Sequence, residues 1–545
     1  MVLRFFSSIF ALAMAGVLFF SSDSILAAVP ELDSLTTVTS VGLSSPMNVN
    51  SLLPVVNNDS SANAQIISLM FRPLLWIGTN LTIDWKESIA KSVSVSANRR
   101  TFTIYLKNWK WSDGRTVTAN DTLACLNLIR KAGVRYPNAG MGGMPNIVES
   151  AKVVNQRTLI ITLKRPVNPT WFELNGLSQL FPIPWWRWKA YSTNDLYRLQ
   201  DNPAMVTVVD GPYKLQRFTL GRNISFVRNP EYSGSRPPLR NLSFTMVTSD
   251  ANAFWALKSG KLQVGMIPHY LYAARGMVNN LRTCVSNGGY GFNYVALNFT
   301  NPSVAFLRDV MVRQALSLAI NQEQIIQVAF HGLGVPGFNP VPTNPDTYLS
   351  PEMKRLVAHP DLAFQPEKAK ELLREAGWRT GKGGIRFKDG RRLGFTLMVP
   401  DTSQTLVAVA ELLQSDWERI GVDLRLHMMP FNLELAKMHP DGKWDSSMIV
   451  WSYNPDYYPS GDGLFNTNGG SNYGDYSNLR MDQLIRDSTE KNGLQYLYQY
   501  EDYAYEQQPV IFLPYPEYIV KYSPDLSRKQ VQEALYSVDC VPETK

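Results

Sequence analysis

Short runs of alternating apolar and polar residues mark the first half of the chain. Residues 101–106 read TFTIYL, a period of two that is typical of a half-buried β-strand. Residues 159–163 and 224–227 follow a similar pattern. Residues 118–132 instead space their apolar side chains along one side of a helix. These patterns predict short strands and helices that alternate along the chain.

A strand–helix–strand unit is predicted in the second half. Residues 393–399 form an apolar strand, and residues 403–420 place an apolar stripe on one face of a helix that Gly421 ends. Residues 422–426 alternate as a second strand. A helix between two such strands connects a parallel pair by a right-handed crossover. Another helix is predicted over residues 366–377, with proline at its start and glycine at its end.

Aromatic residues gather just after another predicted strand. Residues 447–450 are a short buried strand that ends at Trp451, and residues 452–478 are rich in Tyr, Asn, Gly and Asp. That segment is predicted to be a long loop, and long loops in compact domains usually carry function. Because open α/β sheets place ligands at the carboxyl ends of their strands, Trp451 and Tyr453 are candidate ligand contacts.

Composition indicates a globular protein of several domain-sized units. The chain has 545 residues, of which 45% are hydrophobic and 18% are charged. At roughly 100–200 residues per domain, this length corresponds to about three to five units. The formal net charge is +7, without a block of basic residues. No nucleic-acid partner is therefore expected.

The first 28 residues have the pattern of a secretory signal peptide. Arg4 precedes an apolar run over residues 5–20, and cleavage is expected after Ala28. An uncleaved membrane anchor is the alternative interpretation of the same run. No cysteine lies near Ala28, so no lipid attachment is expected, and no later stretch has the length of a membrane span. The mature protein is expected to be exported and soluble.

Three cysteines allow at most one disulfide within the chain. An exported protein meets an oxidising environment, where such bonds persist. Cys125 lies in the predicted helix 118–132 and is expected to be a buried, unpaired thiol. Cys284 and Cys540 are then the candidate pair.

Motifs of enzyme chemistry and of metal binding are absent or in the wrong context. Residues 332–337 spell G-x-G-x-x-G, but they follow a predicted helix, and prolines at 336, 340 and 342 prevent another helix from following. The sequence has no G-x-S-x-G and no H-E-x-x-H motif, and its five histidines lack metal-ligand spacing. No catalytic residue, cofactor or metal ligand is predicted.

A series of short motifs runs in a fixed order through the chain. They are KWSDG at 110–114, VTAND at 117–121, GPY at 211–213, RNPEY at 228–232, KLQV at 261–264, VALN at 295–298, VRQAL at 312–316 and PEKAKELLREAG at 366–377. In this order, the chain resembles the peptide/nickel-type solute-binding proteins, family 5, of bacterial ABC importers over roughly residues 60–515. Each motif is weak alone, but their order and spacing together are specific.

The resemblance implies an α/β fold of two lobes joined by a hinge. This is the type II periplasmic-binding-protein fold, in its large peptide-binding class with an extra subdomain. Lobe I would comprise residues 29–285, with the subdomain inserted at about 60–200. Lobe II would comprise residues 286–508, and residues 509–545 would return to lobe I. The predicted disulfide would then lie at the crossover between the lobes.

The resemblance also implies a function without catalysis. A periplasmic monomer would capture a peptide or similar polar ligand by hinge closure and deliver it to the permease subunits of an ABC importer. The implied ligand contacts are Trp451, Tyr453, Asn454 and Asp456. In peptide-binding members, an Asp three residues after the strand-end Trp holds the ammonium group of the ligand. Asn454 takes that position here, and Asp456 is the acid that is able to substitute.

Three alternatives stay open at this stage. Nickel-type members bind a metal chelate in an aromatic pocket, which Trp451 and Tyr453 would also suit. An exported hydrolase acting in the aromatic cleft is a second possibility, although no nucleophile motif supports it. A docking or chaperone module without a transported ligand is the third.

Overall fold

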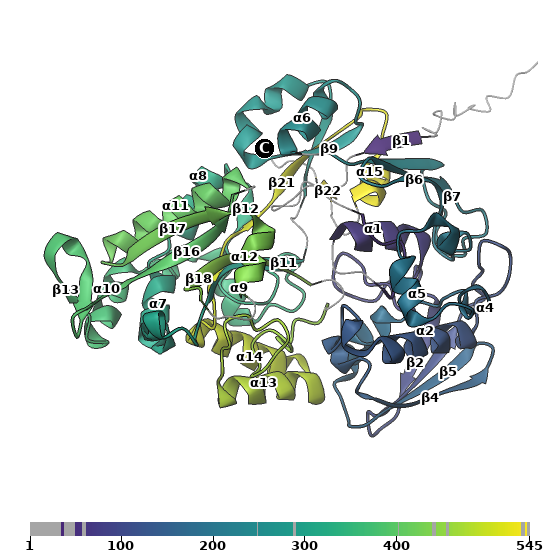
Figure 1. The fold of residues 1–545 in the computed structure, drawn as a ribbon, viewed down its shortest axis with the longest axis horizontal. Helices are drawn as coiled ribbons and strands as arrows, with labels where there is room; N and C mark the ends of the chain where they lie inside the picture. The colour runs from purple at the N-terminus through teal and green to yellow at the C-terminus, as the bar shows by residue number, and fades with distance from the viewer. Residues whose placement is uncertain are drawn as a thin grey trace, which may run out of the picture.

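The fold is described by a computed structural model (Figure 1). It describes residues 34–37, 49–56, 61–247, 249–286, 290–401, 403–438, 443–453, 457–535 and 540–541. The predicted signal peptide, residues 1–28, lies outside these ranges. Within them, sheets of eight, four and five strands organise the chain.

The eight-stranded sheet brings together segments that are far apart in the sequence. Its order is β22 (Cys540–Val541), β10 (Arg282–Ser286), β21 (Tyr518–Tyr522), β9 (Val264–Ile267), β1 (Ser34–Thr37), β8 (Asn241–Thr245), β7 (Asn223–Arg228) and β6 (Tyr213–Thr219). β1 runs parallel to β8 and β9, whereas the other neighbours are antiparallel. The strand predicted at 224–227 is part of β7.

The four-stranded sheet is an insertion between β1 and β6. Its antiparallel order is β2 (Ala90–Val95), β3 (Thr101–Leu106), β5 (Thr158–Leu163) and β4 (Val148–Asn155). Phe102, Ile104 and Leu106 are buried, as the alternation of period two predicts. Helix α2 (Ala119–Ala132) packs on β4 and β5 and buries Cys125. The predicted strands, the helix and the free buried thiol are confirmed here.

The five-stranded sheet contains the predicted strand–helix–strand unit. Its order is β17 (Asp423–Met429), β16 (Gly394–Pro400), β18 (Ser446–Ser452), β11 (Gly291–Leu297) and β19 (Ile511–Leu513). β16 and β17 are parallel and are connected by α11 (Gln404–Arg419), so the prediction is confirmed. The helix predicted at 366–377 is α10 (Pro366–Glu375).

Helices cover both faces of the five-stranded sheet. α7 (Val310–Leu318), α8 (Gln322–Ala329), α10 and α11 share a core with Val295, Leu397 and Met448. α12 (Phe431–Met438) contacts β16 and reaches Ser447 on the other face. Adjacent residues of a strand point to opposite faces, so Ser447 and Met448 face different layers.

The remaining elements connect these sheets. The helices are α1 (Ser61–Met70), α3 (Pro169–Asn175), α4 (Trp185–Trp188), α5 (Thr193–Arg198), α6 (Asp250–Lys258), α9 (Pro351–Ala358), α13 (Leu479–Glu490), α14 (Leu494–Gln507) and α15 (Arg528–Leu535). β12 (Gly334–Val335) pairs with β20 (Tyr515–Pro516), and β13 (Arg379–Thr380), β14 (Arg386–Lys388) and β15 (Arg391–Arg392) form a small sheet.

Over the described ranges, the chain passes between the eight- and five-stranded sheets at two places. One lies between β10 and β11, close to the predicted boundary at residue 285. The other was predicted at residue 509, but β19 pairs with Asn293, Tyr294 and Val295 in the five-stranded sheet. The return therefore occurs between β19 and β21, after residue 513. This crossing follows the predicted lobe boundary by a few residues, and the bounds of the two lobes stay a prediction.

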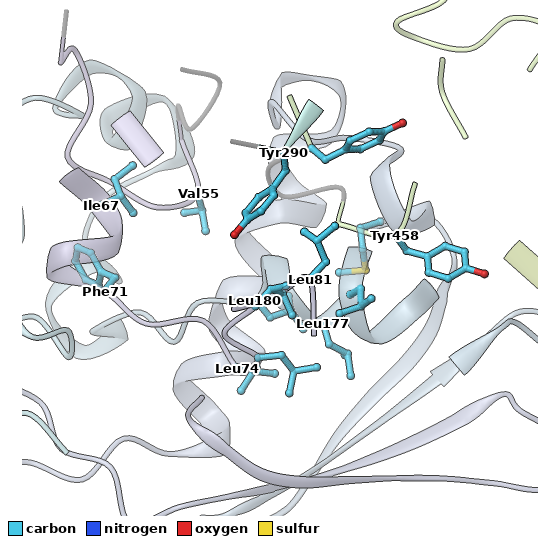
Figure 2. Close-up of a cluster of buried hydrophobic side chains, with 14 of the residues drawn as sticks. Val55, Ile67, Phe71, Leu74, Leu81, Leu177, Leu180, Tyr290 and Tyr458 are labelled. Carbon is cyan, nitrogen blue, oxygen red and sulfur yellow. The ribbon is translucent and has the colours of Figure 1, made fainter. Parts of the chain in front are cut away.

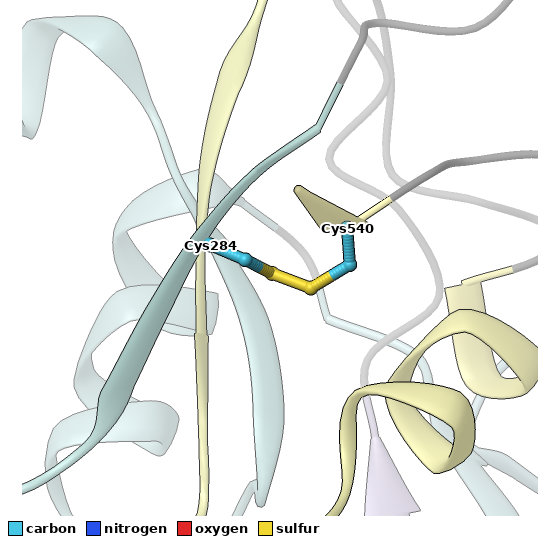
Figure 3. The surroundings of a disulfide bond; sticks show 2 residues. All are labelled: Cys284 and Cys540. Carbon is cyan, nitrogen blue, oxygen red and sulfur yellow. A yellow bond between two sulfur atoms is a disulfide. The ribbon is translucent and has the colours of Figure 1, made fainter. Parts of the chain in front are cut away.

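A disulfide closes the end of the chain onto the eight-stranded sheet (Figure 3). Cys284 lies in β10 and Cys540 in the adjacent strand β22, with their Cα atoms 5.4 Å apart and a sequence separation of 256. The predicted pairing is confirmed.

A single hydrophobic cluster extends across the two halves of the fold. One half contains the eight- and four-stranded sheets, and the other contains the five-stranded sheet. It includes Phe102 of the four-stranded sheet, Phe226 of the eight-stranded sheet and Tyr294 of the five-stranded sheet. Figure 2 shows Tyr290 and Tyr458 near Leu81, in the part of this cluster where the halves meet. The halves are therefore packed against each other in this structure. No helix of the described residues combines the length and the apolar character needed to cross a membrane.

Candidate ligand-binding site

The candidate site is positioned by the antiparallel pair of β11 and β18. These strands pair along their whole length, and Phe292 lies opposite Trp451. Gly291 follows the same register opposite Ser452, where a Cβ atom would collide with the carbonyl oxygen of Trp451. The close approach of the two backbones therefore requires glycine at this position. β18 extends one residue beyond Trp451, which was predicted as its last residue.

Trp451 is partly buried, and its indole N–H makes no hydrogen bond to the described residues. Its ring meets that of Tyr453 edge to face, with centroids 6.3 Å apart. The indole Nε1–H has no acceptor among the described residues, although the atom is shielded from solvent. A buried donor without a partner costs about 1–3 kcal/mol. Trp451 therefore offers both a ring face and a hydrogen-bond donor to a ligand.

Tyr453 has a packing role in this structure. Its side chain has no exposed surface, and its ring lies 6.0 Å from that of Phe292. The hydroxyl donates to the carbonyl oxygen of Pro340, and the amide N–H donates to the carbonyl oxygen of Tyr290. These contacts hold the start of the predicted ligand loop. That Tyr453 also touches a ligand stays a prediction.

Asn454 and Asp456, the other two predicted ligand contacts, lie outside the described residues. The described loop resumes at Tyr457 and continues without helix or strand to Asn478, which caps α13. Over this described part, the predicted long loop is confirmed.

One edge of β18 is open near Trp451. Among the described residues, β18 pairs with β16 only through Ser446 and Ser447. Residues 448–452 therefore have a strand partner on the β11 side alone, and they span about 13 Å. An open strand edge presents backbone N–H and C=O groups that an extended ligand is able to pair with.

A buried carboxyl group lies at the inner end of this open edge. Glu434 of α12 is fully buried and accepts a hydrogen bond from the Ser447 hydroxyl. Burial raises the pKa of Glu434 to about 7, although hydrogen bonds from Ser447 and from the Met448 backbone act in the opposite direction. Among the described residues, no cation contributes to the pKa shift of Glu434. This group is able to exchange a proton near neutral pH.

Sequence patterns did not single out Glu434. The only local signal is an acidic residue within the otherwise mostly apolar segment 431–438. In the described part of the chain, no group of three or more His, Cys, Asp or Glu side chains is arranged to hold a metal ion.

Comparison with known families decides the class of the protein. The sequence profile of the bacterial extracellular solute-binding proteins, family 5, matches residues 84–475. The chain belongs to this family. Because family 5 is a class of solute-binding proteins, the predicted binding function without catalysis is confirmed, and the alternative of a hydrolase is not supported.

Curated relatives of this family 5 protein cover most of its length. The oligopeptide-binding protein AppA of Bacillus subtilis (strain 168) is 25% identical over 448 residues, which are 80% of this chain and 79% of AppA. The dipeptide-binding protein of Escherichia coli (strain K12) is 26% identical over 397 residues, or 69% and 68% of the two chains.

Solved structures share the fold of this family 5 protein. AppA from Bacillus subtilis in complex with a nonapeptide superposes with a TM-score of 0.71 at 20% identity, covering 94% of this chain and 100% of AppA. NikZ from Campylobacter jejuni in complex with Ni(L-His) also gives 0.71, at 22% identity, covering 92% and 95%. The predicted two-lobe α/β fold is confirmed.

Proposed function

We propose that this protein captures a peptide, or a similar polar ligand, between its two halves and delivers it to the permease subunits of an ABC importer. The family match over residues 84–475 carries this proposal. It is supported by relatives that are named as oligopeptide- and dipeptide-binding proteins. Capture would follow closure of the halves about the two chain crossings.

The open edge of β18 supports a ligand with an extended backbone. A peptide along residues 448–452 would add a strand there, with main-chain hydrogen bonds giving affinity. The indole N–H of Trp451 would donate to a ligand carbonyl, and its ring would pack on an apolar or flat part of the ligand. Tyr453 and Asn454 complete the proposed contacts.

In this proposal, Asp456 binds the cationic end of a ligand. Asn454, a neutral amide, stands where the resemblance implies an acid, and it gives directional but uncharged hydrogen bonds. Asp456→Asn is expected to weaken binding markedly only for ligands with a cationic group at that end. Calorimetric titration of matched peptides with free and acetylated amino termini checks this.

The proposed site of action is the periplasm. Removal of residues 1–28 would release a monomer without a lipid anchor, with its two lobes divided near residue 285 and again after β19. Intact-mass measurement on exported protein tests the cleavage, and a retained Met1 or an added acyl chain would contradict it. Light scattering tests the monomer.

Native mass spectrometry of gently purified protein tests the ligand class. The expected result is a set of co-purifying masses that fragment as peptides, together with a raised melting temperature in dipeptide to nonapeptide mixtures. A co-purifying metal chelate, or stabilisation by Ni(L-His) alone, would replace the peptide with the chelate. Protein without ligand that no mixture stabilises would favour the docking or chaperone module.

A further inference from the structure

A buried asparagine, Asn175, is hydrogen-bonded to the loop that follows the proposed ligand contacts. The Nδ2–H of Asn175 donates to the carbonyl oxygen of Tyr458 at 2.9 Å, and the N–H of Tyr458 donates to Asn175 Oδ1 at 2.7 Å. Asn175 and Tyr458 have no exposed surface. One amide side chain therefore replaces a strand partner for residue 458, two positions after Asp456.

Asn168 reinforces this contact from the other end of α3. Its Nδ2 group donates to the Tyr458 hydroxyl at 3.2 Å and to the Ser488 carbonyl at 3.0 Å. Its backbone N–H donates to the carbonyl oxygen of Thr489 at 2.7 Å. Together, the two asparagines connect α3 to the loop and to the end of α13.

Two arginines also connect α3's half of the fold to the end of α13. Arg165 pairs with Glu490 at 2.7 Å, and Arg99 donates to the Glu490 carbonyl at 2.6 Å. The Arg165 and Glu490 side chains remain 43% and 42% exposed, so water and salt screen their attraction. The directional bonds of Asn175 are enclosed and escape this screening.

These partners belong to different halves of the fold. α3 follows the four-stranded insertion, whereas Tyr458 and α13 follow β18 of the five-stranded sheet. Figure 1 shows the insertion beside α13 and α14 at the bottom of the molecule. Within the described chain, the halves are joined covalently only at the β10–β11 and β19–β21 crossings. The contact between Asn175 and Tyr458 therefore depends on how the halves are placed.

We propose that Asn175 is a positioning residue that supports ligand capture by clamping Tyr458, near the start of the described loop after β18, to the opposite half. The consequence for ligand binding rests on the proposed function, whereas the clamp itself does not. Asn175 is hydrogen-bonded to both the N–H and the C=O group of residue 458, so a substitution at Asn175 changes the loop locally. Its effect on ligand appears mainly as faster release, because the halves separate more readily.

Hydrogen exchange tests the clamp directly, in the ligand-free protein and again with a dipeptide to nonapeptide mixture added, because the contact exists only while the halves lie together. In Asn175→Ala, the amide of Tyr458 loses its acceptor and is expected to exchange at least about 10-fold faster, while amides of β16 and β17 keep their rates. The matched control is Tyr458→Phe, which removes only the hydroxyl contact of Asn168 and should leave exchange at residue 458 within about twofold. Unchanged exchange in Asn175→Ala would overturn the proposal.

A second variant guards against misfolding. Circular dichroism and melting curves accompany every variant, and Asn175→Ser replaces Asn175→Ala if the latter does not fold. The serine hydroxyl lacks the amide fork, so exchange at residue 458 should still accelerate. An equal acceleration across all sheets would show a general structural role and would also overturn the clamp.

Release of a captured peptide tests the consequence. With a random-sequence nonapeptide library as the probe, Asn175→Ala is expected to release bound peptide at least about 10-fold faster, and Tyr458→Phe to stay within about threefold of the parent. If the parent binds no nonapeptide, the peptide proposal fails, while hydrogen exchange still decides the clamp. If the parent binds and Asn175→Ala releases peptide at the parental rate, the positioning role is refuted.

Discussion

Asn229 joins two sequence motifs into one structural unit. Its Nδ2 group donates to the carbonyl oxygen of Gly211, and its backbone N–H donates to that of Pro212, both at 2.8 Å. A Cβ atom at Gly211 would collide with the backbone of Met70, so this position admits only glycine. The motifs GPY and RNPEY thus occur together because each satisfies the backbone of the other.

Trp451 is the residue on which the proposed site depends most. Trp451→Ala is expected to weaken binding of the isolated ligand by about 1–3 kcal/mol, roughly 5- to 150-fold, through lost ring burial. Trp451→Phe keeps a ring but removes the N–H, so about 1 kcal/mol should be lost. Calorimetric titration measures both, with Trp255→Ala on exposed α6 as the control. Parental affinity in Trp451→Ala would place the site elsewhere.

Glu434 is expected to make stability depend on pH. Its pKa is raised from 4.5 to about 7 by burial, so the folded protein binds more protons than the unfolded chain between these values. The stabilising contribution of the protonated group is complete below about pH 4.5 and is lost as the pH rises through about 7. The loss amounts to about 3 kcal/mol at most.

Glu434→Gln removes this titration. The variant is expected to be more stable than the parent at pH 8 and to differ little from it at pH 5, as measured by urea unfolding at both values. Glu173, whose pKa burial also raises to about 7, titrates in both proteins and cancels in the difference. Parallel pH profiles for the two proteins would rule out this role for Glu434.

At the scale of elements, the VRQAL motif anchors the end of a helix. Arg313 of α7 is buried and donates to the carbonyl oxygens of Gln507 and Gln508, where α14 ends. The same guanidinium donates to the carbonyl oxygens of Leu307 and Arg308. Residues 302–308 form a short 3-10 helix, so one side chain supplies donors to the last carbonyls of this segment and of α14.

Arg313→Lys tests this anchoring. Lysine keeps the charge but lacks the planar fork, so several buried carbonyl groups lose their donors. The free energy of unfolding is expected to fall by about 2–4 kcal/mol in urea titration. Arg391→Lys in exposed β15 is the matched control and should stay within about 0.5 kcal/mol of the parent. Equal stability of both variants would contradict the anchoring role.

At the scale of the whole molecule, a covalent bond and packing contacts stabilise different parts of the fold. The disulfide holds the tail on the eight-stranded sheet, whereas the continuous core and the α3 contacts hold the halves together. Burial raises the pKa of the remaining cysteine, Cys125, to about 12, so its thiol stays protonated and unreactive.

Removing the disulfide by the double change Cys284→Ser and Cys540→Ser is expected to lower the free energy of unfolding by about 5 kcal/mol in the chain-entropy model, because the closed loop is long. Urea unfolding of the double variant measures the loss. Cys125→Ala is the control, and thiol labelling of the unfolded parent should detect one free cysteine. A pairing of Cys125 with either partner would contradict the assignment.

Local patterns were sufficient to predict most elements. The helix predicted at 403–420 is α11, and the predicted strands at 101–106 and 159–163 are β3 and β5, because periodicity reflects which side of each element is buried. The sheet in which residues 511–513 pair was not evident from the sequence. A short strand that is buried on both faces carries no alternation to indicate its sheet.

The sequence by itself determined the family, the pairing of Cys284 with Cys540 and the place of Trp451 near the end of its strand. They follow from motif order, from the expected burial of Cys125 and from patterns spanning a few residues. Only the tertiary structure decided that Tyr453 is enclosed, that Glu434 lies beside β18 and that Asn175 holds Tyr458. Asn175 and Tyr458 are 283 positions apart in the sequence. Contacts between residues so far apart leave no periodic signal, because they form only when separate layers pack.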